Sequence, residues 1–79
     1  MRHSDDELDR MLLVARQQDP SIEPTAGADI LRACLDELAA HPDADAAEVA
    51  RRCVAHNPTA DASWVAHLAR AAVMTVRAS

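Results

Sequence analysis

Prolines divide the chain into runs that each carry apolar residues at helical spacing. They occupy four positions, Pro20, Pro24, Pro42 and Pro58. The residue before a proline is displaced from the helical region of backbone space, so these positions favour breaks between helices. The pattern therefore predicts four helices, over about 4–18, 26–41, 44–56 and 60–77.

Capping residues support these boundaries. Ser4 and Glu7 form a capping-box pattern, in which each side chain bonds to the backbone amide of the other residue. N-cap candidates for the later helices are Thr25, Asp43 or Asp45, and Thr59 or Asp61. Ile22, in the connector between the first two runs, is expected to be an apolar anchor.

The chain is expected to form one all-α domain over residues 1–79, a small compact four-helix bundle. No run alternates apolar and polar residues as a strand would, and the connectors are only a few residues long. Short connectors favour near-antiparallel packing of sequential helices.

The apolar content is dominated by small side chains. Alanine accounts for 18 residues, whereas Leu, Ile, Val and Phe together account for 15 of the 79. Burying alanine removes little area from water, so the core is expected to be marginal. A core with little buried apolar area favours self-association or docking on a larger protein.

The use of Arg without any Lys is typical of a GC-rich bacterial genome.

The net charge of −5 is concentrated in the first half of the chain. An acidic domain repels phosphate backbones and anionic lipids, so neither nucleic acid nor a membrane is expected as a partner. The first residues lack the apolar core of a signal peptide, and no run is long enough to span a bilayer. A cytoplasmic location is therefore expected.

Cysteine and histidine leave a metal or redox alternative open. Cys53 and His56 are three residues apart on one helix face, and Cys34 comes from the preceding helix, so together they could contribute to a zinc site. A Cys34–Cys53 disulfide is also conceivable. Both cysteines lie on apolar stripes, however, where cysteine behaves as a small hydrophobic residue. We therefore expect no metal, no cofactor and no catalytic residue.

A small DNA-binding regulator is a further alternative. The segment 47–52 resembles the first helix of a helix-turn-helix motif, but the turn after it is too long and the next helix lacks a basic stripe. Under this alternative, the phosphate contacts would come from Arg51, Arg52, Arg70 and Arg77.

The leading expectation is a non-enzymatic protein–protein interaction module, either a homodimer or other homo-oligomer, or an adaptor or regulatory subunit of a larger assembly. Leu13, Val14 and Met74 lie off the narrow apolar stripes, which predicts either burial on a broad face or an exposed apolar patch. Trp64 is the single aromatic residue and is either a lid of the core or an interface anchor.

Overall fold

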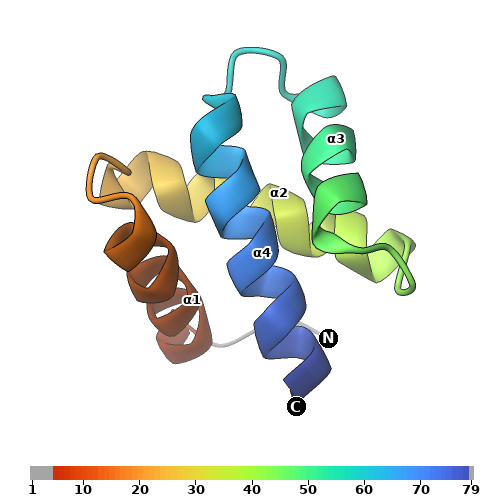
Figure 1. Ribbon diagram of the computed structural model, residues 1–79, viewed down its shortest axis with the longest axis horizontal. Helices are drawn as coiled ribbons and strands as arrows, with labels where there is room; N and C mark the ends of the chain where they lie inside the picture. Colours follow the sequence, from red (N-terminus) through yellow and green to blue (C-terminus); the bar gives the residue numbers. More distant parts are fainter. Residues whose placement is uncertain (1–4, 79) are drawn as a thin grey trace.

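The computed structural model describes residues 5–78, which form four helices and no strand. The helices are α1 (Asp5–Gln18), α2 (Pro24–Ala40), α3 (Ala46–His56) and α4 (Ala62–Ala78) (Figure 1). The all-α four-helix bundle is confirmed, and each helix boundary lies within two residues of the predicted one. Ser4, half of the expected capping box, lies outside the described residues.

The start of α2 differs from the prediction. Glu23, and not Thr25, is the N-cap, because its carboxylate accepts hydrogen bonds from the amides of Thr25 at 3.1 Å and Ala26 at 2.7 Å. Pro24 fills the first helical position, where a missing N–H costs nothing. The prediction of Thr25 was wrong because it relied on the usual N-cap residues, which are Ser, Thr, Asp and Asn. Glutamate is not among them, but the longer side chain of Glu23 reaches the first amides of the helix.

The connector before α2 is held from both sides. Ile22 is fully buried, which confirms it as the apolar anchor. Its carbonyl accepts a hydrogen bond from Nε of Arg16 at 2.9 Å. The connector is therefore anchored to the bundle at Ile22.

Aspartates cap the last two helices. Oδ1 of Asp45 accepts from the amide of Glu48 at 2.8 Å, and Oδ1 of Asp61 accepts from the amides of Ser63 and Trp64 at 2.9 and 3.2 Å. Of the alternatives, these two residues are thus the caps. Each of these helices begins at the residue after its cap, which is two residues later than predicted.

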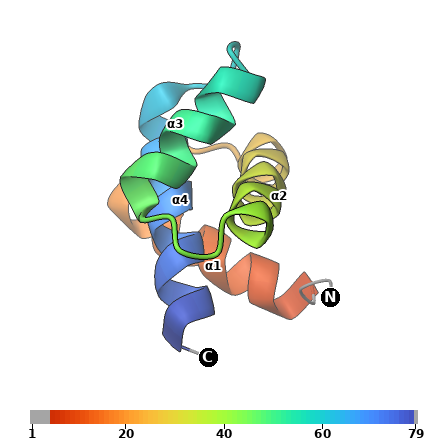
Figure 2. The same cartoon turned by 90° about the vertical axis from the view of Figure 1, so that its right-hand side faces the viewer.

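The central helix of the bundle is α4, which packs against the other three. Within the described chain, α1 and α3 lie on opposite sides of α4 and do not contact each other (Figure 1). α3 and α4 run antiparallel, as expected for sequential neighbours. α2 departs from that expectation, because it runs crosswise behind α4 and is seen nearly end-on in Figure 2. By crossing, α2 contacts all three other helices.

The core is apolar and closely packed. No polar or charged residue of the described chain is buried, and every buried polar side-chain atom there has a hydrogen-bond partner. The buried face of α4 combines branched side chains with alanines, and consists of Val65, Leu68, Ala69, Ala71, Ala72 and Val73. In the described range, no helix has the length and apolarity that a membrane span requires.

Candidate functional site

The two cysteines meet in the core between α2 and α3. Cys34 and Cys53 are fully buried free thiols whose side chains lie within hydrogen-bonding reach of each other. Burial raises the pKa of both thiols, and the neighbouring Cys53 adds to the rise at Cys34. Both sulfurs are therefore protonated at neutral pH, and a protonated thiol is a poor nucleophile.

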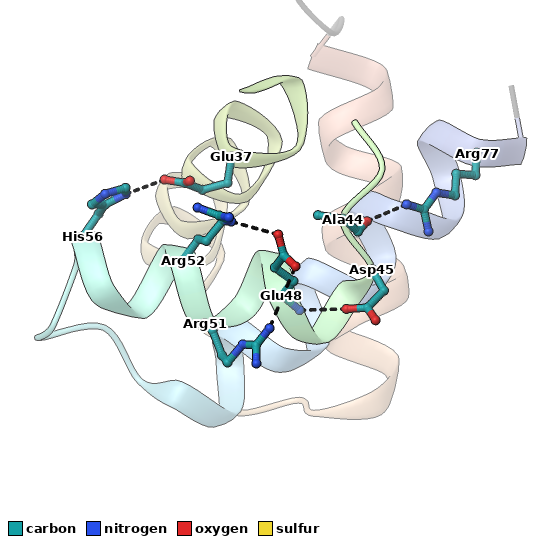
Figure 3. A network of polar contacts seen from close by, with 8 residues as sticks. All are labelled: Glu37, Ala44, Asp45, Glu48, Arg51, Arg52, His56 and Arg77. Atoms are coloured by element: carbon teal, nitrogen blue, oxygen red, sulfur yellow. Dashed lines mark hydrogen bonds and ion pairs between the residues drawn. The ribbon is translucent and has the colours of Figure 1, made fainter. Parts of the chain in front are cut away.

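The last turn of α3 covers this pair. Asn57 is the C-cap of α3, and its side-chain amide donates to the carbonyl of Cys53 at 3.0 Å and lies 3.9 Å from the Cys53 sulfur. Nδ1 of His56 lies 2.5 Å from Oε2 of Glu37 on α2, as Figure 3 shows. The contact between Glu37 and His56 therefore joins the end of α3 to α2, beside the thiols.

The spacing between the thiol and the polar residue is the same on both helices. Glu37 follows Cys34 by three residues, and His56 follows Cys53 by three. Residues three apart on a helix lie on the same face, so the polar contact stands one turn from the thiol contact. The sequence alone did not single out Glu37, although the matched spacing was a signal that could have identified it.

The structure does not assemble the three residues of the metal alternative. In the described part of the chain, no group of three or more His, Cys, Asp or Glu side chains is placed to hold a metal ion. Cys34 and Cys53 are brought together, but Nδ1 of His56 is engaged by Glu37. The pair is therefore a two-sulfur site with a polar cover.

Most of the arginines of the DNA-binding alternative are engaged within the molecule. Arg52 and Arg51 share the carboxylate of Glu48, at 3.0 and 4.0 Å (Figure 3). The guanidinium of Arg77 donates to the carbonyl of Ala44 in the loop between α2 and α3. Arg70 is exposed on the outer face of α4. These contacts reduce the positive charge that the four residues present to a phosphate backbone.

The expected interaction residues fall into two groups. Leu13, Val14 and Met74 are exposed, with 55%, 45% and 57% of their surface accessible. Trp64 is half-buried against the core, and its indole N–H donates to Oγ of Ser21 at 3.1 Å. Trp64 thus lies as a lid on the core and links the start of α4 to the connector before α2.

A shallow open hollow of about 360 Å³ lies at the loop between α2 and α3. Its lining consists of Ala40, His41, Pro42, Asp43, Ala44 and Glu48. The Arg77 contact with the Ala44 carbonyl fixes one side of this loop to the end of α4. The hollow is a feature of the loop surface and is separate from the buried thiols.

Comparisons with protein-family models, with curated proteins and with solved structures found no match. The features that bear on function are therefore those of the chain itself. They are the thiol pair beneath the end of α3 and the exposed apolar side chains of α1 and α4.

Proposed function

We propose that the protein is a non-enzymatic, cytoplasmic interaction module that self-associates through the outer face of α1. The observation that carries the proposal is the exposure of two consecutive large apolar side chains, Leu13 and Val14, on that helix. Contiguous exposed apolar side chains mark interaction surfaces, and the buried centre of an interface is more apolar than its rim. Met74 is equally exposed, but it stands alone on α4.

The position of α1 in the fold supports this choice. α1 packs only against α2 and α4, so the side opposite these helices has no cover from the described chain. Exposed charged residues of both signs, Asp9 and Arg10, lie one turn before Leu13 on the same side of the helix. An apolar centre with a mixed polar rim is typical of interfaces that form between soluble partners.

A second copy of this chain suits the charge distribution of α1. The first turn is acidic, and Arg16 is in the last turn. Two α1 helices that pair antiparallel bring the acidic end of one towards the basic end of the other, and they also align the helix dipoles favourably. The cytoplasmic part of the proposal is supported by the two free thiols, which a reducing compartment preserves.

The test is the mass of the purified protein in solution over a concentration series, measured by light scattering after size exclusion and by native mass spectrometry. The wild type is expected to form a dimer, and the double variant Leu13→Gln, Val14→Gln is expected to remain a monomer with the same helical circular dichroism. Met74→Gln is the matched control, because it makes the same change at an equally exposed position.

A wild type that stays monomeric at its highest soluble concentration would contradict self-association. A dimer that survives the double change but is lost in Met74→Gln would place the interface on α4 instead of α1.

A further inference from the structure

We propose that Cys34 and Cys53 are a redox-active pair, which a low-molecular-weight disulfide converts to a disulfide bond between α2 and α3, and that Cys53 reacts first. The proposal is independent of self-association. It rests on the contact between two free thiols from different helices and on the unequal cover above them.

The two cysteines differ in how easily the chain can expose them. Cys34 lies in the middle of α2, a helix that contacts all three others. Cys53 lies in the last turn of α3, three residues before the end of that helix. Helix ends open locally at a lower free energy than helix centres, so an opening of the last turn exposes Cys53 while Cys34 stays covered.

The contacts of Asn57 and His56 restrain this opening. Asn57 holds the Cys53 carbonyl through both its backbone amide, at 2.9 Å, and its side-chain amide, at 3.0 Å. Glu37 holds His56 at 2.5 Å. His56 and Asn57 are exposed residues, so water competes for their side chains and the contacts form a cover that can open and close.

Opening of the last turn also favours Cys53 as the attacking group. Burial is the largest cause of the raised pKa of the Cys53 thiol. At Cys34, burial and the neighbouring Cys53 both raise the thiol pKa. An opening of the last turn relieves the burial of Cys53 while Cys34 stays covered, so Cys53 is the thiol that ionises more readily.

The reaction balances as two exchanges. The Cys53 thiolate attacks one sulfur of the small disulfide, which forms a mixed disulfide and releases one small thiolate. The Cys34 sulfur, after losing its proton, attacks Sγ of Cys53, and the mixed disulfide bond breaks to release a second small thiolate. Two protein thiols are oxidised, one small disulfide is reduced to two thiols, and the two protons pass to those thiols.

The experiment incubates the folded, reduced protein with oxidised glutathione and follows its mass with time. The wild type is expected to lose two hydrogen masses with only a transient glutathione adduct. Cys34→Ala is expected to hold a stable adduct on Cys53, whereas Cys53→Ala is expected to react at least tenfold more slowly. A second measurement needs no variant and so does not depend on a variant folding. The remaining thiols of the wild type are alkylated during the reaction, and peptide mapping then shows which cysteine reacted first.

The cover is tested in the same assay. Glu37→Gln and His56→Ala both release the end of α3 and are expected to accelerate the first exchange several-fold. Acceleration in Glu37→Gln alone would show that the charge of Glu37 acts on the thiols, and that its contact with His56 does not restrain them. Glu48→Gln is the control, because it removes ion pairs from the same helix away from its last turn.

Three results would overturn the proposal. They are a glutathione adduct that accumulates in the wild type without conversion to a disulfide, equal reaction rates in the two alanine variants, and oxidation that occurs only after the helices unfold.

Discussion

The backbone of Gly27 lies so close to Ile22 that a Cβ added to this glycine would stand 2.7 Å from Cγ2 of the isoleucine. The same Cβ would stand 2.9 Å from Cδ1 of Leu12 on α1. Glycine is therefore required in the first turn of α2 by close packing, since its backbone has no positive φ. Leu12 is only partly buried and can move, but Ile22 is fully buried.

Gly27→Ala is therefore expected to destabilise the protein. Alanine is favoured over glycine in a helix by about 1 kcal/mol, but overpacking a closed site costs about 1–3 kcal/mol. The net loss is expected to be about 1 kcal/mol in a urea titration followed by circular dichroism. Ile22→Leu removes the Cγ2 methyl, so Gly27→Ala should cost less in that background. An equal cost in both backgrounds would show that Ile22 is not the obstacle.

A second relationship concerns Trp64 and Ser21, which are 43 residues apart in sequence. The Ser21 hydroxyl accepts from the indole N–H and donates to Asp19 at 2.6 Å. Ser21→Ala should lower stability by roughly 0.5–1 kcal/mol, since the site is near water. It should also shift the tryptophan fluorescence to longer wavelength. Ser63→Ala is the control, because the bond of Ser63 to Asp61 uses the backbone amide and survives. A spectrum unchanged by Ser21→Ala would contradict the contact.

The alanines on the buried face of α4 are expected to be sensitive to size. Ala72 is fully buried where α4 meets its neighbours, whereas Ala66 on the same helix is exposed. Ala72→Val should lower the free energy of unfolding by about 1–3 kcal/mol through overpacking. Ala66→Val should change it by at most about 0.5 kcal/mol. Similar losses in the two variants would indicate that helix propensity, and not packing, sets the cost.

The helices could be predicted because the information that defines them is local. Stripes such as Leu31, Cys34, Leu35 and Leu38 depend on residues within one or two turns, and so do the caps Asp45 and Asp61. The burial of both cysteines followed from the same stripes. The start of α2 was wrong by two residues because Pro24 was assigned to the connector, although proline also suits the first helical position.

The contacts that define the candidate site could not be predicted in this way. Three contacts join segments that are separated in sequence: Glu37 with His56, Trp64 with Ser21, and Arg77 with the carbonyl of Ala44. These pairs depend on how α2 crosses α4, and that crossing is set by packing of whole helix faces and not by any short pattern. The same holds for the exposure of Leu13 and Val14, which depends on which side of α1 the rest of the chain covers.

The carboxylate of Glu23 makes the stability of α2 dependent on pH. Hydrogen bonds from the amides of Ala26 and then Thr25 hold the pKa of Glu23 below its ordinary value of 4.5. A group whose pKa is lowered by folding stabilises the folded state fully above its unfolded pKa. That contribution is lost as the pH falls through the lowered value.

Wild type and Glu23→Gln are therefore expected to differ in Tm by a constant amount at pH values well above 4.5, with the wild type higher, and the difference should shrink below that pH. Thermal melts over a pH series test this, and the other carboxylates cancel because they titrate alike in both proteins. Glu23→Ala, which also removes the neutral acceptor, should lie below Glu23→Gln by an amount that does not change with pH. A wild-type advantage that persists undiminished into strong acid would mean that the ionised carboxylate is not what caps the helix.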